Sequence, residues 1–195
     1  DIDSAVEFAN LAAGVVVGKV GSSTSTINEI IEYESSINQS TSDKHIKSFN
    51  EIIELSSELK LKGKKIVFTN GCFDLLHSGH VRYLEEAKNF GDTLIVGLNS
   101  DSSLRTLKGK GRPINDEMDR AYILAALEVV DYVVIFNEDT PYKLIKAIKP
   151  NTLVKGGDYK GIKVAGQDIA EELKLISFID GKSTTKTIEK IQQIF

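Results

Sequence analysis

The sequence predicts an α/β protein: a parallel sheet with helices on both faces, preceded by a short helical segment. Three observations lead to this fold class. From residue 65 onward, short runs rich in β-branched residues alternate with longer runs of helical periodicity. The short runs are apolar almost throughout, as expected of strands that are buried on both faces. A glycine-bearing turn with two histidines directly follows the first run. Alternating strands and helices of this kind form a Rossmann-like sheet, whose ligands bind beyond the carboxyl ends of the strands.

Composition sets limits on partners and compartment. The chain has 195 residues, enough for one domain or one domain and a fragment. Its 24 basic and 28 acidic residues give a net charge of −4, so no overall basic field favours nucleic acid. A single cysteine excludes a disulfide framework, and there is no signal-peptide pattern or membrane-spanning apolar run. We therefore predict a cytoplasmic protein with no nucleic-acid or membrane partner.

The first 34 residues are predicted to form two short helices. The first, over 4–20, is rich in small apolar residues on most of its faces, and Gly21 ends it. Thr26 and Glu29 have capping-box spacing and begin a second helix, which runs to about Glu34. Two such helices cannot bury this much apolar surface alone. We expect the chain, which begins at Asp1 within this pattern, to be part of a longer protein.

Residues 35–47 are predicted to be a linker, since 35–44 are mostly polar. Ser48 and Glu51 again have capping-box spacing, and they begin a helix to about Leu61. The main domain is therefore expected to span 48–195. Its predicted strands are 65–69, 93–98, 132–136, 152–154 and 175–178. Its later helices are predicted at 79–90, 117–129, 141–148, 166–173 and 185–194.

The turn over 71–80, with the sequence Gly-Cys-Phe-Asp-Leu-Leu-His-Ser-Gly-His, is the candidate site. It joins the first strand to a helix, whose free N–H groups and dipole favour an anion. Gly79 has no side chain, so a phosphate group can approach the backbone closely there. His77 and His80 can donate hydrogen bonds to phosphoryl oxygens as negative charge develops on them.

Two other interpretations of this turn remain open. A single histidine near a helix start is usually a cap or a surface residue, although a pair at this position is harder to explain in that way. Metal binding by Cys72, Asp74, His77 and His80 is the second. A helical zinc site more typically has histidines at i and i+4, whereas these are at i and i+3. We therefore expect no metal site.

Cations and polar groups follow the later strands. Asn99 and Asp101 end the second predicted strand, and a loop over 107–113 carries three cations separated by glycines. Alone, this loop would be a solvated surface loop, but next to a phosphate site its cations can stabilise a transition state. Lys108 is the preferred candidate there, with Lys110 second. Arg120, at the start of a predicted helix, can reach the same edge, or it can be an ordinary surface ion-pair partner.

Two further motifs lie near the carboxyl end of the chain. Lys155-Gly156-Gly157-Asp158 follows the fourth strand, where the two glycines permit unusual backbone angles. Gly181-Lys182-Ser183 is not a P-loop, because the first glycine of that motif would fall on Ile176. The run Ser183-Thr184-Thr185 can still offer hydroxyl and N–H groups to the β- and γ-phosphates, or simply cap the last helix.

The His77-Ser78-Gly79-His80 motif resembles the signature of the nucleotidyltransferase superfamily that carries His-x-Gly-His. Lys155-Gly156-Gly157-Asp158-Tyr159 resembles its sugar-phosphate adenylyltransferase branch, and residues 1–34 resemble the end of a ribokinase-like sugar kinase. One departure is that related cytidylyltransferases have an arginine shortly before Ser-Thr-Thr, where this chain has Asp180-Gly181-Lys182. In this order, the segments resemble the family of bifunctional ADP-heptose synthases.

The resemblance implies transfer of AMP from ATP to D-glycero-β-D-manno-heptose 1-phosphate, with Mg²⁺ carried on the triphosphate. It also implies a homodimer and a missing N-terminal kinase domain; no kinase activity is expected from this chain. The expected catalytic residues are His77, His80, Lys108 and Arg120. The expected nucleotide-binding residues are Thr69, Asn70, Gly71, Cys72, Phe73, Gly79, Ser183, Thr184 and Thr185. The expected substrate-binding residues are Asn99, Asp101, Lys155, Gly156, Gly157 and Asp158.

Two alternative functions are left open. One is a glycerol-3-phosphate cytidylyltransferase, against which the kinase-like segment and the Lys-Gly-Gly-Asp motif argue. The other is a nucleotide-binding module without turnover, against which the combination of histidines, lysine and hydroxyl groups argues.

Overall fold

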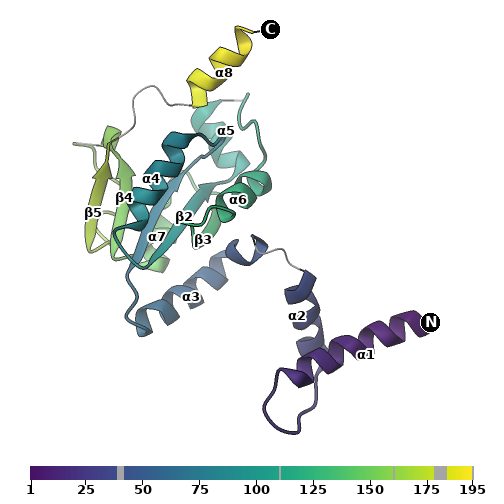
Figure 1. Ribbon diagram of the computed structural model, residues 1–195. Helices are drawn as coiled ribbons and strands as arrows, with labels where there is room; N and C mark the ends of the chain where they lie inside the picture. Colours follow the sequence, from purple (N-terminus) through teal and green to yellow (C-terminus); the bar gives the residue numbers. More distant parts are fainter. Residues whose placement is uncertain (39–41, 110, 160, 178–183, 195) are drawn as a thin grey trace. The chain divides into compact units, whose positions relative to one another are not determined.

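A computed structural model describes residues 1–38, 42–109, 111–159, 161–177 and 184–194 (Figure 1). The chain divides into two compact units, 1–44 and 45–195. No helix among the described residues is both long enough and apolar enough to cross a membrane.

The larger unit contains a five-stranded, all-parallel sheet in the order β3-β2-β1-β4-β5 (Figure 1). Its strands are β1 Ile66–Gly71, β2 Thr93–Asn99, β3 Tyr132–Phe136, β4 Thr152–Gly156 and β5 Glu172–Ile176. The predicted α/β class, with a parallel sheet and a preceding helical segment, is confirmed. The chain reverses its direction of progress across the sheet between β1 and β4, and ligands bind at this type of switch point.

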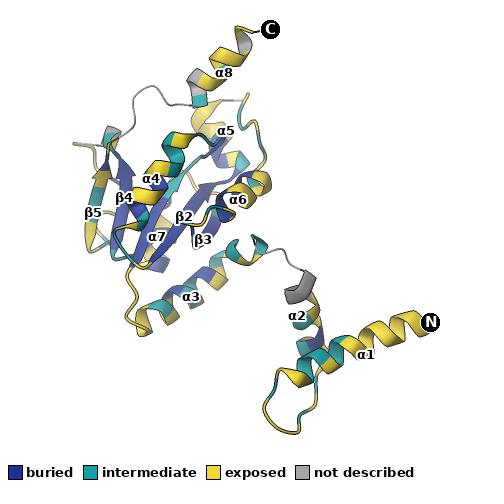
Figure 2. Ribbon diagram, viewed as in Figure 1, coloured by how far each residue is buried: buried dark blue, intermediate teal, exposed yellow. Residues whose placement is uncertain are grey.

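Helices cover both faces of the sheet. The helices of this unit are α3 Phe49–Leu61, α4 Ser78–Lys88, α5 Asp101–Lys108, α6 Glu117–Ala125, α7 Tyr142–Ile148 and α8 Thr184–Gln192, and a 3₁₀ helix spans Gly157–Tyr159. One buried cluster joins α4 and α6 to the sheet through Val67, Leu84 and Leu124. The other joins α3 and α7 to the opposite face through Ile52, Phe68 and Ile145 (Figure 2). Because Val67 and Phe68 are adjacent in β1, they point to opposite faces.

Local sequence signals explain several helix boundaries. Ser48 and Glu51 form the predicted capping box at the start of α3. Asp116 accepts two backbone N–H hydrogen bonds at the start of α6. The predicted strands at 65–69, 93–98, 132–136 and 152–154 match β1 to β4 to within about two residues, an ordinary scatter for element ends.

Two element predictions are wrong. No helix was predicted over 101–108, but these residues form α5. The Ser100 side chain caps this helix by accepting a hydrogen bond from the backbone N–H of Ser103. The helix predicted over 166–173 does not form. Gly166 has φ +84° and packs closely on Ile145, and residues 172–176 pair with β4 instead as edge strand β5.

The smaller unit contains α1 Ile2–Val17 and α2 Ile27–Asn38, with a 3₁₀ helix at Asp43–His45 at its boundary. Thr26 and Glu29 make reciprocal hydrogen bonds, as the capping-box spacing predicts. Gly14 allows α1 to approach α2, because a Cβ there would lie 2.5 Å from the Tyr33 ring. No residue of α1 is buried (Figure 2). Among the side chains that the structure describes in this unit, the large exposed apolar ones are Ile2, Val6, Phe8, Val17, Val20, Ile27 and Ile31.

Candidate active site

The histidine turn leaves the carboxyl end of β1, next to the switch point between β1 and β4. His77 is the residue before the first turn of α4, and His80 lies within that turn. The Ser78–Gly79 pair between them lies at the amino end of α4, where N–H groups are not used by the helix. The parallel sheet thus brings two imidazoles and a helix N-terminus to one edge.

The two imidazole rings are stacked. Their centroids are 3.8 Å apart, and the ring planes are inclined by 15°. The edge of Phe73 packs on His80 at 5.3 Å between centroids, and Phe73 is itself buried with φ +43°. A left-handed conformation at a residue other than glycine costs about 1–2 kcal/mol. Gly71 makes room for that ring, since a Cβ there would lie 3.0 Å from it. The backbone of the turn therefore supports the position of His80.

Burial sets the protonation state of His80. Two causes lower the pKa of His80 from 6.5 to about 4: the larger is removal of the imidazole from water, and the smaller is the nearby His77. Its buried Nδ1 has no hydrogen-bond partner within the described residues. A neutral imidazole with an unused polar atom can donate to or accept from a ligand at neutral pH.

This pKa predicts how stability depends on pH. The unfolded chain binds a proton at His80 near pH 6.5, whereas the folded protein does so only near pH 4. The stabilisation is therefore complete above about pH 6.5 and is lost as the pH falls toward about 4. We expect urea unfolding to show a decreasing free energy of unfolding across this window. The His80→Gln variant should show a flatter dependence, and equal slopes for the two proteins would contradict the assignment.

Lys155 provides a buried cation at the switch point. It is the second-last residue of β4, is 6% exposed, and donates a hydrogen bond to Oδ1 of Asn70 in β1. Its Nζ also lies 5.1 Å from the centre of the Tyr159 ring. Gly156 and Gly157 follow it at the end of β4 and the start of the 3₁₀ helix. The side chain of Asp158 lies outside what the structure describes.

Arg120 is surrounded by protein, whereas the sequence pattern predicts that it reaches the phosphates or the surface. Its side chain is fully buried, and its guanidinium group donates four hydrogen bonds to protein acceptors. These acceptors are Cys72 O at 2.7 Å, Asn99 O at 2.9 Å, Asp101 Oδ1 at 2.7 Å and Asn115 O at 3.1 Å. The guanidinium therefore joins the ends of β1, β2 and α5 to the segment before α6. In this structure the guanidinium of Arg120 faces protein acceptors, and its expected contact with phosphate stays a prediction.

Several other candidate side chains also have protein partners. The Thr69 hydroxyl is buried at 2.7 Å from Tyr83 Oη, and Asn99 donates to Ser103 Oγ at 2.9 Å. Asp101 pairs with Arg120, and its backbone N–H donates to Glu117. Burial raises the pKa of the Cys72 thiol, so Cys72 is not activated as a nucleophile.

Lys108 and Thr184 come to the histidine turn from distant parts of the sequence. Lys108 is the exposed last residue of α5, and its positive charge opposes the rise in the pKa of the Cys72 thiol. Thr184 begins α8 and donates a hydrogen bond from Oγ1 to Leu75 O at 3.3 Å. Ser183, Lys110 and the side chain of Thr185 lie outside the described residues. The edge around the turn thus combines two imidazoles, Lys108 and the start of α8.

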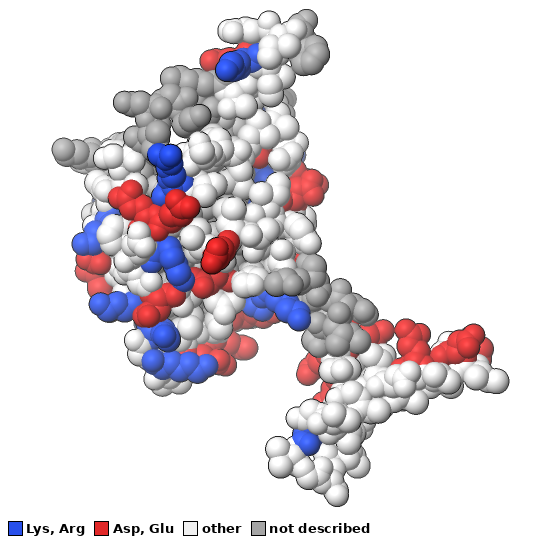
Figure 3. All heavy atoms as spheres, in the orientation of Figure 1, with Lys and Arg blue, Asp and Glu red and all other residues white. Residues whose placement is uncertain are grey.

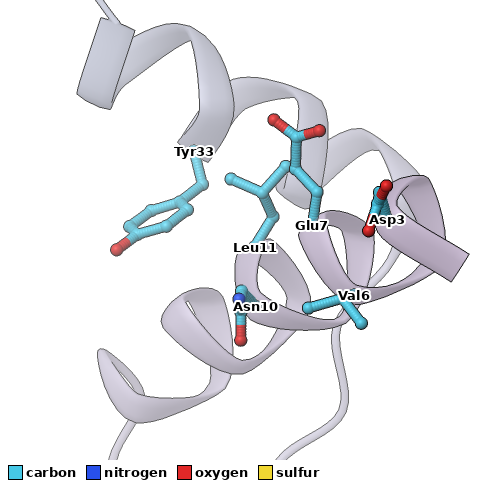
Figure 4. A pocket seen from close by; sticks show the side chains of 6 residues that line it. All are labelled: Asp3, Val6, Glu7, Asn10, Leu11 and Tyr33. Carbon is cyan, nitrogen blue, oxygen red and sulfur yellow. The ribbon is translucent and has the colours of Figure 1, made fainter.

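The surface charge of the larger unit and the depression in the smaller unit can be compared with what a nucleotide site requires. On the face of the larger unit shown in Figure 3, acidic and basic side chains are interspersed rather than gathered by sign. A depression of about 490 Å³ lies in the smaller unit, where Asp3 and Glu7 line it (Figure 4). Two carboxylates repel a triphosphate, so this depression is not the nucleotide site. Among the residues that the structure describes, no three His, Cys, Asp or Glu side chains are placed to hold a metal ion.

A Rossmann-like sheet with this histidine turn at its carboxyl edge defines the nucleotidyltransferase class. The cytidylyltransferase-like family matches residues 68–193, and the chain belongs to that family. It is 67% identical over 193 residues to the bifunctional protein HldE of Aliarcobacter butzleri, and 52% identical over 195 residues to that of Geobacter metallireducens. These matches cover 99% and 98% of this chain, but only 40% of each relative.

Two solved structures have similar folds. The lipopolysaccharide core biosynthesis protein from Thermoplasma volcanium has 33% identity and a TM-score of 0.53, over 60% of this chain and 100% of that one. A pantoate-beta-alanine ligase from Francisella tularensis has 19% identity and a TM-score of 0.53, over 76% and 77% of the two chains. At that identity the second likeness concerns the fold alone.

Proposed function

We propose that residues 48–195 transfer AMP from ATP to D-glycero-β-D-manno-heptose 1-phosphate, giving ADP-heptose and pyrophosphate. The observation that carries the proposal is the stacked His77–His80 pair at the start of α4, beside the switch point of the sheet. Supporting it are the similarity to HldE proteins and the Lys155-Gly156-Gly157 sequence at the end of β4.

The reaction requires positioning and charge stabilisation more than an enzyme nucleophile. A phosphate oxygen of the sugar phosphate attacks the α-phosphorus of ATP, and the bond from that phosphorus to the β-phosphate oxygen breaks. In this proposal His77 and His80 donate hydrogen bonds to the phosphate oxygens on which charge develops, and Lys108 adds positive charge. Lys155, oriented by Asn70, binds the sugar phosphate. ATP is bound with Mg²⁺ on its own phosphate oxygens.

Pyrophosphate release tests both substrates together. ATP and CTP are each offered with heptose 1-phosphate and with glycerol 3-phosphate, and we expect turnover only with ATP and the heptose phosphate. Turnover only with CTP and glycerol phosphate would replace the substrates but keep the site. If all four combinations are silent while ATP still binds, the chain is a binding module and the proposal fails.

The domain arrangement is also a proposal. The chain spans about 40% of the length of the HldE relatives. We infer that residues 1–34 end a kinase-like domain, which residues 35–47 link to the transferase domain. The exposed apolar side chains of α1 and α2 would then be covered by the rest of that kinase-like domain. The homodimer implied by the resemblance can be tested by light scattering of the full-length protein.

A further inference from the structure

Asp74 is a buried carboxylate in the histidine turn, three residues before His77. Its side chain is 1% exposed, and it forms an ion pair with Nε of Arg112. Its Oδ1 accepts the N–H of Ile114 at 2.7 Å and that of Asn115 at 3.4 Å. A carboxylate taken out of water needs such partners, because its desolvation is otherwise costly. All of these partners lie in one segment, about 40 residues further along the chain.

That segment, 111–116, is part of the connection between Lys108, the end of α5, and Glu117, the start of α6. Asp74 O also accepts a 3.4 Å hydrogen bond from the Asn115 side chain, and Arg120 donates to Asn115 O. At its far end, Asp116 caps α6. At its near end, Gly109 follows Lys108 with φ +95°, a conformation in which glycine meets no steric penalty. Contacts with Asp74 therefore determine where the segment lies against the turn.

We propose that Asp74 is a positioning residue: through Arg112 it holds the 111–116 segment against the histidine turn, and it thereby limits where the nearby Lys108 can lie. The expected effect on kcat rests on the proposed nucleotidyl transfer, whereas the expected effect on the position of the 111–116 segment does not. Arg112 reaches the turn through its ion pair with Asp74, and the positive charges of Lys108 and Arg112 both oppose the rise in the pKa of the Cys72 thiol in the same turn. The Asp74 carboxylate faces this segment, so metal binding by Asp74 is not supported.

The experiment compares Asp74→Asn, Arg112→Gln and the double variant. Asparagine can still accept the Ile114 N–H, but it cannot pair with the Arg112 charge. We expect each single variant to lower kcat by about a hundredfold, while KM for ATP changes by less than about tenfold. The double variant should be no slower than Asp74→Asn, because both changes remove one interaction. Arg112→Lys keeps the charge and should recover part of the loss.

Matched controls separate this effect from a general loss of charge. Arg105→Gln, in the exposed part of α5, and Asp119→Asn, in the exposed first turn of α6, should keep the parent kcat. Trypsin cleavage after Lys108 gives a readout that needs no turnover, and both single variants should accelerate it equally. Arg112 is partly exposed, so its variants remain informative if Asp74→Asn folds poorly.

Two results would overturn the inference. One is additive losses in the double variant, and the other is unchanged cleavage after Lys108 in both single variants. If the parent protein shows no transfer with any substrate, the proposed function fails, whereas the cleavage experiment still decides whether Asp74 holds the segment.

Discussion

Replacing His80 by glutamine is expected to lower kcat for nucleotidyl transfer by about 10²–10³-fold, with a much smaller change in KM for ATP. Removing one preorganised donor to a developing negative charge has an effect of this size in other enzymes. Glutamine keeps a donor on a side chain of similar length, but it loses the stacked ring contact with His77 and the edge contact with Phe73. The donor would then be less well oriented. His77→Gln should show a loss of similar size.

The third histidine provides a matched control. His45 lies outside the turn, and its Nδ1 is 2.7 Å from the carbonyl oxygen of Asp131. His45→Gln should keep nearly full activity when the three variants are compared by pyrophosphate release under saturating ATP. Thermal unfolding of each variant shows whether a loss of rate reflects loss of folded protein. If His77→Gln and His80→Gln both keep the parent rate, the histidine pair is not part of the chemistry.

The sheet could be predicted because its strands carry their own signal. Four of the five strands are largely buried, and their sequences are mostly apolar apart from polar residues and glycines, most of them near the strand ends. The edge strand β5 has the sequence Glu-Leu-Lys-Leu-Ile, which mixes charged and apolar residues. Polar residues suit an exposed edge, but the spacing there also fits a helix. The strand predicted at 175–178 overlaps only the last two residues of β5, and pairing with β4 sets the observed start at Glu172.

The histidine turn was also predictable, because its residues are contiguous in the sequence. The contacts of Arg120 and Asp74 were not predictable, because their partners are distant in the sequence. Arg120 lies 19 residues from Asp101 and 48 from Cys72, and Asp74 lies 38 residues from Arg112. The sequence around an arginine or lysine near a phosphate site does not show whether its side chain faces the ligand or the rest of the protein. One local signal was available and missed: Ser100 and Ser103 have the spacing of a helix cap, and they begin α5.

Arg120→Met is expected to reduce the free energy of unfolding by about 3–5 kcal/mol, the range for removing one partner of a buried ion pair. Methionine fills much of the same volume but donates no hydrogen bond. The carbonyl oxygens of Cys72 and Asn99, together with the Asp101 carboxylate, would lose their guanidinium donors. Arg120→Lys keeps the charge without the planar set of donors, so we expect an intermediate loss.

Urea unfolding of these variants, with Arg82→Met as the control, tests whether Arg120 joins the segments beneath the site. Arg82 is exposed on α4, and its replacement should change the free energy of unfolding by less than about 0.5 kcal/mol. Combining Arg120→Met with Asp101→Asn should cost less than the sum of the single losses, because the second change removes a carboxylate already left without its donor. Similar small losses for Arg120→Met and Arg82→Met would show that the buried guanidinium does not hold these segments together. Activity losses in Arg120 variants would then have to come from direct contact with substrate.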